Sequence, residues 1–214
     1  MRLPISKMLK KRGQIDVARL QDEVVQMVYS LDIDAVLHGG TAIWRCYAGY
    51  RFSEDLDFYS SSLFSLKADF KKMSISHGLS VPKFKSTGNV LFSSISDGRT
   101  NANLEVNLRK KVHSIVLPYI NADGTSFQIR TLSAENLILE KIEAYCERRF
   151  IRDFYDIYHL LPFVEDKTPI REEVALLLTG TDSPVDEGVL KTIIYTGVTP
   201  SFDRMKLELT RWVK

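Results

Sequence analysis

Two aspartates separated by one residue are the first feature of this sequence that could carry chemistry. Asp55-Leu56-Asp57-Phe58 alternates acidic and apolar side chains, as a half-buried strand does. In a strand both carboxylates lie on one face, about 7 Å apart, where they repel each other. A hard cation such as Mg²⁺ relieves that repulsion through oxygen ligands. The pair therefore predicts a metal-binding strand, and the alternative is a solvated strand face without a ligand.

A turn with two glycines precedes this strand. His38-Gly39-Gly40-Thr41 follows a short apolar run over residues 33–38 and leads into a predicted helix with Thr41 as its cap. Such a turn offers bare backbone N–H groups beside the positive end of a helix, which suits a phosphate. Gly39, Gly40 and Thr41 are therefore candidate phosphate contacts, and the alternative is an ordinary turn. His38 either lines the same pocket or packs at the strand edge.

A third carboxylate lies on another predicted strand, Asn101–Arg109. Apolar residues occupy alternate positions there, so Glu105 falls on the opposite, polar face. If this strand neighbours the strand of Asp55 and Asp57, Glu105 completes a cluster of three carboxylates for two metal ions. Taken alone, the strand is equally compatible with a surface glutamate.

Charged residues also interrupt two predicted helical stripes further along the chain. On a helix that opens at Ser133, Lys141 occupies the stripe that should face the core. On the next predicted helix, Asp153 and Asp156 likewise occupy the stripe that should face the core. Because buried charges need partners, one interpretation is an ion network that joins these helices. Another is that Lys141 contacts a triphosphate while Asp153 orients the triphosphate or the acceptor, and a third is that the lysine extends its ammonium to water. Other cations available to such a network are Arg148, Arg149 and Arg152.

The hydropathy pattern changes along the chain and divides it into two halves. Predicted helices cover residues 16–31, 42–47 and 66–77, and predicted strands cover residues 33–38, 55–59, 89–95, 101–109, 113–120 and 127–130. After Ser133 the pattern is helical throughout. We therefore expect an α/β half with a mixed sheet over residues 1–131 and a helical half over residues 132–214 that packs against it.

The overall composition excludes several classes of protein. The 214 residues are 44% hydrophobic and 26% charged, which is the globular average. Lys and Arg (29) nearly balance Asp and Glu (27), so there is no global attraction to nucleic acid or anionic membranes. Cys46 and Cys146 show no paired spacing, which is typical of a reducing compartment. Without a targeting segment or a long apolar stretch, the sequence predicts a cytoplasmic protein that does not associate with a membrane.

Three segments together resemble a known family. They read HGGTAIWRCYAGYRFSEDLDFYS, LEVNLR and LSAENLILEKIEAYCERRFIRDFYDIYHLL, and the resemblance covers about residues 34–161. The glycine turn followed by DLDF is similar to the metal-binding signature of the nucleotidyltransferase superfamily. The fuller pattern resembles the AbiEii/AbiGii family of abortive-infection and toxin–antitoxin nucleotidyltransferases. The resemblance implies a nucleotidyltransferase-like mixed sheet with flanking helices, followed by a helical half that closes the active-site cleft.

The resemblance also implies roles for individual residues. The implied metal ligands are Asp55, Asp57 and Glu105, and Glu105 stands where the superfamily often has its third carboxylate, as a ligand or general base. The implied nucleotide contacts are Gly39, Gly40, Thr41 and Lys141. The implied catalytic residues are Asp55, Asp57, Glu105, Lys141 and Asp153. Asp156 matches the same distal element of the family as Asp153, in a structural or a functional role.

The function implied by this resemblance is the transfer of a nucleoside monophosphate from an NTP to an acceptor hydroxyl, with Mg²⁺ or Mn²⁺ as cofactor. RNA, such as tRNA, is the expected acceptor, and a cognate antitoxin is the expected partner. One alternative is a non-catalytic nucleotide- or RNA-binding member of the same fold. A second is a glycosyltransferase that uses a DxD motif and a nucleotide sugar, which a chain of this length with a helical half fits poorly.

Some features of the sequence carry less information. The four histidines show no ligand spacing, so no zinc site is predicted. Lys83, Lys85 and residues 109–111 could form a basic rim for RNA, or a solvated face. Tyr47, Tyr50 and Phe52 could frame a base, or pack in the core.

Overall fold

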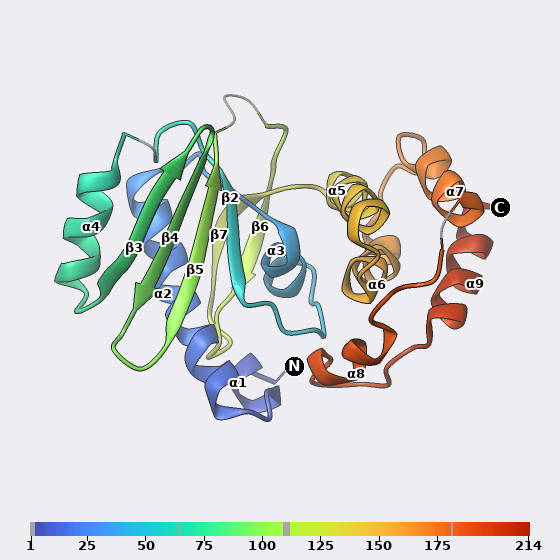
Figure 1. Cartoon of the computed structure of the whole chain (residues 1–214), viewed down its shortest axis with the longest axis horizontal. Coiled ribbons are helices and arrows are strands. Elements are labelled where there is room, and N and C mark those ends of the chain that lie inside the picture. The colour runs from blue at the N-terminus through green and yellow to red at the C-terminus, as the bar shows by residue number, and fades with distance from the viewer. Residues whose placement is uncertain (1–2, 64, 109–111, 181) are drawn as a thin grey trace.

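A single mixed sheet is the centre of the molecule. The computed structural model describes residues 3–63, 65–108, 112–180 and 182–214 (Figure 1). Within these residues, seven strands lie in the order β3-β4-β5-β2-β1-β7-β6. They are β1 (Val36–His38), β2 (Asp55–Tyr59), β3 (Ser80–Thr87), β4 (Val90–Ser96), β5 (Asn101–Asn107), β6 (Ile115–Ile120) and β7 (Ser126–Thr131). The pairs β1–β7 and β2–β5 are parallel and the other neighbours are antiparallel, which confirms the predicted α/β class and mixed sheet.

Helices cover the sheet and extend the molecule to one side. They are α1 (Ile5–Met8), α2 (Arg12–Leu31), α3 (Gly39–Cys46), α4 (Lys67–Ser76), α5 (Ala134–Arg148), α6 (Ile151–Leu160), α7 (Arg171–Gly180), α8 (Leu190–Ile193) and α9 (Phe202–Val213). In the N-terminal part, α2 and α4 pack on each other and against the sheet. The helices from α5 to α9 gather beside the sheet, and α3 contacts both the sheet and the pair α5–α6 (Figure 1). None of the helices in the described residues combines the length and apolar character needed to cross a membrane.

Side chains alternate along β5 between an apolar, buried face of the sheet and a polar face. Ala102, Leu104 and Val106 are buried, while Glu105 is only half-buried on the opposite face. The main hydrophobic core contains side chains from both sides of residue 131, including Leu56 of β2 and Ile138 of α5. The two halves therefore pack together as the sequence predicts, and a domain boundary at residue 131 stays a prediction.

Several element boundaries differ from the sequence-based expectations. Helix α2 begins at Arg12 rather than at residue 16, and β1 begins at Val36 rather than at residue 33. Strand β3 was not predicted, because it is an edge strand with mostly exposed side chains and no clear alternation. The strand that holds Glu105 ends at Asn107, and residues 109–111 lie outside the described residues.

Candidate active site

The pairing of β2 with β5 brings the three predicted carboxylates to one cleft. The strands are parallel, and their register places Asp57 beside Glu105 and Asp55 beside Asn103. All four side chains line a cleft of about 320 Å³, together with Lys83 of β3 and residues of β4. The neighbouring strands that the cluster requires are therefore present.

Burial and neighbouring charges both act on the central carboxylate. Burial raises the pKa of Asp57, attraction from His38 and Lys141 opposes this shift, and repulsion from Asp55 and Glu105 adds to it. The amide of Asn103 donates to Asp55 over 3.2 Å. The amide of Asn107 donates to Glu105 over 3.1 Å. The cluster thus carries negative charge that its own hydrogen bonds compensate only in part.

The donor set at this cleft fits a hard divalent cation. All three acidic side chains offer oxygen, which Mg²⁺ and Mn²⁺ prefer. Burial is the main cause of the raised pKa of Asp57, and a cation would offset the repulsion from Asp55 and Glu105 that adds to it. Over the described part of the chain, however, no three His, Cys, Asp or Glu side chains converge closely enough to form a ready-made metal site. The carboxylates share a cleft, and their grouping around an ion stays a prediction.

The two glycines of the turn make room for charged neighbours. Gly39 has a φ of +70°, and a Cβ there would lie 2.5 Å from Oδ2 of Asp57. A Cβ on Gly40 would lie 2.5 Å from Nη2 of Arg51 and 2.6 Å from Oγ of Ser53. Side chains at either position would therefore displace the carboxylate or the guanidinium. Neither Arg51 nor Ser53 was assigned a role from the sequence, although both lie a few residues before the DLD strand.

The third residue of the turn is not the helix cap that the sequence predicts, and its contact with a phosphate stays a prediction. Helix α3 begins at Gly39, so Thr41 lies within its first turn and is not its cap. The Thr41 side chain is fully buried, and its hydroxyl donates to the main-chain oxygen of Asp55 over 2.6 Å. Thr41 therefore holds the start of β2 against α3, which positions the first aspartate of the cleft.

An ion network joins α5 and α6, as one interpretation of the sequence predicts. Nζ of Lys141 lies 3.2 Å from Oδ1 of Asp153 and 2.9 Å from Oδ2 of Asp156. Arg148 donates to both oxygens of Asp153 at 2.8 and 2.9 Å. Arg51, from the loop before β2, donates to both oxygens of Asp156 at 2.5 Å. Three cations thus surround two carboxylates, which leaves one positive charge in excess beside the acidic cleft.

The network keeps both of its aspartates ionised. Burial alone would raise the pKa of Asp156, but attraction from Arg51 and Lys141 outweighs it and holds the pKa below the ordinary value. The pKa of Asp153 is likewise lowered, because bonding to Arg148 and attraction from Lys141 outweigh burial. Both aspartates are fully buried and line no part of the acidic cleft. They hold Lys141 in place, at a range where its charge still acts on Asp57.

The other two candidate arginines lie outside this network. Arg149, in the left-handed conformation that ends α5, pairs with Asp182 at 2.9 Å. Arg152 rests over the ring of Phe150, 5.5 Å from its centre. The sequence could not distinguish these arginines from Arg148, because all of them lie within one or two helical turns of the aspartates.

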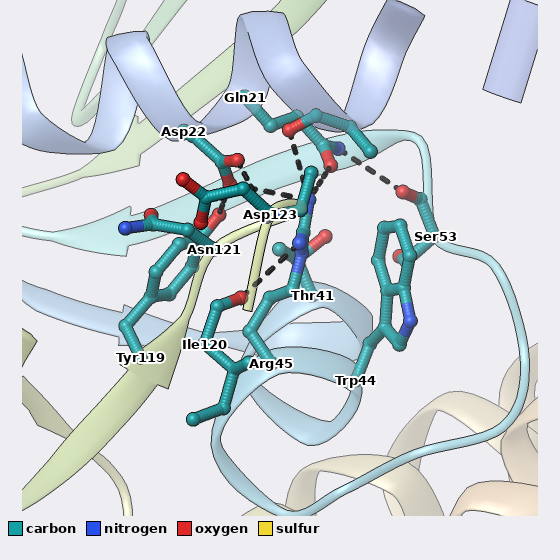
Figure 2. A network of polar contacts seen from close by, with 12 residues as sticks. Gln21, Asp22, Thr41, Trp44, Arg45, Ser53, Tyr119, Ile120, Asn121 and Asp123 are labelled. Atoms are coloured by element: carbon teal, nitrogen blue, oxygen red, sulfur yellow. Dashed lines mark hydrogen bonds and ion pairs between the residues drawn. The ribbon is translucent and has the colours of Figure 1, made fainter. Parts of the chain in front are cut away.

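A second polar network fixes the segment that leads into β2 (Figure 2). The amide of Gln21, on α2, donates to the main-chain oxygens of Ser53 at 3.0 Å and Glu54 at 2.8 Å. Arg45 of α3 is fully buried beside it and donates to the oxygens of Ala18 at 2.9 Å and Ile120 at 3.2 Å. Helix α2 therefore holds the backbone that precedes Asp55, and α3 is tied to α2 and β6.

His38 is buried next to Asp57 and is held by two residues. Its Nδ1 lies 3.1 Å from Oε2 of Glu140, and its ring stacks on Tyr59 with the ring centres 3.8 Å apart. The hydroxyl of Tyr59 donates to the other oxygen of Glu140 over 2.6 Å. Within the described residues, Nε2 of His38 is buried and has no hydrogen-bond partner. His38 also opposes Asp57 across the β1–β2 pair, so it lies against the acidic cluster.

Comparison with models of known protein families identifies the family of the chain that carries this arrangement. The model of the AbiEii nucleotidyl transferase toxin family, described as a type IV toxin–antitoxin system, matches residues 27–187. This chain belongs to the AbiEii family. The matched range contains the glycine turn, the DLD strand, Glu105 and the complete α5–α6 ion network, and the resemblance stated from the sequence is confirmed.

Solved structures show that the AbiEii chain has a nucleotidyltransferase-like fold. The JHP933 protein of Helicobacter pylori superposes with a TM-score of 0.67 at 20% identity, covering 95% of this chain and 91% of that chain. MenT4, a nucleotidyltransferase toxin of Mycobacterium tuberculosis, superposes with a TM-score of 0.60 at 16% identity, covering 95% and 89%. A putative nucleotidyltransferase from H. pylori gives 0.59 at 19% identity, covering 95% and 94%. No curated protein sequence matches this chain.

Proposed function

We propose that this AbiEii-family chain transfers a nucleoside monophosphate from an NTP to an acceptor hydroxyl. The observation that carries the proposal is the register of β2 and β5, which puts Asp57 beside Glu105 and against the Gly39–Gly40 turn. In the reaction, the acceptor oxygen bonds to the α-phosphorus, the bond from that phosphorus to the bridging oxygen breaks, and pyrophosphate leaves. RNA, such as tRNA, is the proposed acceptor.

The carboxylates supply the acidic side of this site. Asp55, Asp57 and Glu105 are the residues proposed to hold Mg²⁺ or Mn²⁺, because they offer oxygen ligands and excess negative charge in one cleft. If bound there, a divalent ion would neutralise charge on the phosphates and orient the attacking oxygen. Glu105, which is half-buried, is proposed either to bind that ion or to accept the proton from the acceptor hydroxyl.

The glycine turn and Lys141 supply the basic side. The main-chain N–H groups of Gly39 and Gly40 are proposed to contact the phosphates, because neither glycine has a side chain to block the approach. Arg51 lies against Gly40 and adds positive charge there. Lys141 donates toward Asp153 and Asp156, which leaves its third N–H for a phosphate or for Asp57. Asp153 is proposed to act by holding Lys141 rather than by touching the substrate.

The family description assigns AbiEii proteins to type IV toxin–antitoxin systems, so we propose that this chain is the toxin of such a pair and that a cognate antitoxin opposes its activity. The reaction is the part that can be measured on the purified chain. The opposition by an antitoxin is measured in cells, where co-expression of the antitoxin should restore growth.

The experiment that tests the reaction is incubation with each labelled NTP, Mg²⁺ or Mn²⁺ and total cellular RNA. The expected result is label in the RNA pool that depends on the divalent ion and is lost in Asp57→Asn. Binding of NTP without incorporation into RNA, protein or a small molecule would instead identify a non-catalytic nucleotide-binding member of the fold. Label in protein would keep the transfer reaction and reject RNA as the acceptor.

A further inference from the structure

A large groove among the described residues lies away from the carboxylates. It has a volume of about 920 Å³, runs between α6 and α9 and is closed by the loop at residues 196–200. It is larger than the acidic cleft of about 320 Å³, and neither the carboxylates nor the ion network line it. We call it the aromatic groove, after the residues of its first wall: Tyr50, Tyr155, Tyr158, His159 and Phe163.

The aromatic wall is held in place before any ligand binds. Nε2 of His159 donates to the main-chain oxygen of Tyr47 over 2.8 Å, which fixes the ring in the middle of the wall. Tyr50 and Phe163 contact that ring with centres 5.8 and 5.7 Å away, and Tyr155 stacks on it at 6.1 Å. The outer rings of Tyr50 and Phe163 remain 42% and 40% exposed. The groove therefore presents flat apolar surfaces to solvent at a low cost in side-chain ordering.

The opposite wall carries positive charge. Arg204 and Arg211 of α9 both pair with Glu208, at 2.9 and 3.2 Å. One carboxylate thus serves two guanidinium groups, whose side chains are 63% and 62% exposed. This wall has one positive charge in excess, and its arginines stay open to an anion. Trp212 of α9 also lines the groove.

A ligand that matches both walls needs flat rings and negative charge at a regular spacing. Single-stranded nucleic acid has both, because bases stack on aromatic side chains while arginines take the phosphates. An apolar peptide would leave the arginines unused, and an acidic peptide would leave the ring wall unused. We propose that the aromatic groove binds a single-stranded stretch of RNA, with bases on the exposed rings of Tyr50 and Phe163 and phosphates on Arg204 and Arg211.

The groove and the acidic cleft share structural elements. Tyr50 lines the groove, and the next residue, Arg51, lies against Gly40 and binds Asp156. Helix α6 presents Tyr155 and Tyr158 to the groove, while its buried acidic side chains face α5 and Arg51. In this proposal the bound strand is the acceptor for the transfer. This role rests on the proposed function, whereas binding of RNA to the groove does not.

Binding is tested with the full chain and a labelled, unstructured single-stranded RNA, by fluorescence anisotropy at several salt concentrations. Phe163→Ala should weaken binding by roughly 5- to 100-fold, because a base loses its stacking partner. The double variant Arg204→Ala/Arg211→Ala should weaken binding at least about 10-fold and lower the salt slope by about 0.7 for each lost phosphate contact. The matched controls are Lys206→Ala and Leu207→Ala on α9, which do not line the groove and should bind as the wild type does.

A second measurement uses the unmodified chain and needs no variant to fold. RNA that contains a photoreactive base should cross-link to the groove wall, and peptide mapping should find the adducts at Tyr50, Tyr158 or Phe163. Cross-links confined to other surfaces, or unchanged RNA affinity in folded groove variants, would overturn the proposal. So would displacement of the RNA by an acidic peptide or a free mononucleotide at the same concentration as unlabelled RNA.

The test separates failure of the groove from failure of the proposed function. Thermal stabilisation by Mg²⁺ and NTP should be the same in the groove variants and in the wild type, because the carboxylates and the glycine turn are untouched. A wild type that binds RNA in the groove but transfers no nucleotide would uphold the groove and reject the transfer reaction. A wild type that transfers nucleotide equally well after loss of the groove would reject the groove alone.

Discussion

Two groups of charged residues lie side by side in this molecule and are built in opposite ways. The α5–α6 network has three cations for two carboxylates, and both aspartates have lowered pKa values. The acidic cleft gathers Asp55, Asp57 and Glu105, and the pKa of Asp57 is raised. Cations within the network neutralise both of its carboxylates, whereas the negative charge of the acidic cleft is neutralised only in part by neighbouring residues.

This difference indicates which group is shaped for the fold and which for a ligand. A buried ion pair adds little net stability, but it specifies one arrangement of the elements that it joins. Here it fixes Lys141 and Arg51 relative to the glycine turn. Repelling carboxylates lower stability and are tolerated where a ligand offsets them. The first expectation is thus that removing charge from the two groups has opposite effects on stability.

Asp57→Asn should have the largest effect on activity and the most favourable effect on stability. We expect nucleotide transfer to fall by at least about 10³-fold, because a proposed metal ligand is lost. The apo protein should be as stable as the wild type or more stable by ~0.5–2 kcal/mol, since the repulsion is relieved. Incorporation assays and thermal melts measure both, with Asp69→Asn on the exposed face of α4 as the control. A variant that melts well below the wild type would make Asp57 a structural residue.

Arg51→Met should have the largest effect on stability. Asp156 is fully buried, and loss of its two-point partner leaves it with Lys141 alone, at a cost of about 3–5 kcal/mol. Chemical denaturation at pH 7 measures this cost. Arg148→Met is the control, because its side chain is 40% exposed and the cost should be smaller. Adding Asp156→Leu to Arg51→Met should restore part of the stability, and equal losses in all three proteins would contradict the assigned network.

Lys141→Met should lower activity strongly and stability only moderately. Two arginines still balance the two aspartates, so the stability loss should be smaller than in Arg51→Met. Loss of a cation that is proposed to contact the transferring phosphates should cost roughly 2–4 kcal/mol in transition-state stabilisation. Steady-state kinetics and denaturation of the same preparation measure the two effects. Unchanged kcat/KM in an active enzyme would remove Lys141 from the site.

The smallest predicted effect is a difference in the response to acid. Asp153 and Asp156 have pKa values below those of the unfolded chain, so their stabilisation is complete above the unfolded pKa and is lost as the pH falls through the folded pKa. Asp57 has a raised pKa, so its protonation stabilises the fold as the pH falls. Denaturation between neutral and acidic pH in the presence of a chelator should therefore show a flatter loss for Asp156→Asn than for the wild type, and a steeper one for Asp57→Asn. Slopes that change in the same direction would contradict the comparison.

Short-range patterns made much of the fold and site predictable. The alternation around Asp57 and Glu105 identified β2 and β5 and the face on which the carboxylates lie, because a strand alternates its side chains across the sheet. Lys141 on an apolar helical stripe, followed by two aspartates on the next stripe, predicted the interhelical network. Each of these strand and helix patterns depends only on neighbours within its own element, and the two helices follow each other in the sequence.

The missed features depend on contacts between distant segments. Arg51 lies in a loop with no periodicity, and its partner Asp156 is 105 residues away in the sequence. Arg45 occupies a helix that is mostly buried, and its bonds go to α2 and β6. Strand β3 is held by pairing with β4 rather than by a buried face of its own. In each case the conformation depends on a partner outside the element itself, and local sequence patterns do not identify that partner.

The loop that carries Arg51 is completed by a segment from near the C-terminus. The main-chain N–H of Phe52 donates to the oxygen of Ile193 over 2.9 Å, and that of Tyr195 donates to the oxygen of Tyr50 over 3.1 Å. The hydroxyl of Tyr195 also accepts from Trp44 and donates to Gly49.

These contacts have a consequence during synthesis of the protein. Because the ribosome makes residues 49–52 long before residues 193–195, a nascent chain lacks the backbone partners of Tyr50 and Phe52, the two neighbours of Arg51. The loop at residues 49–52 therefore gains these backbone hydrogen bonds only after the segment at residues 193–195 has emerged from the ribosome.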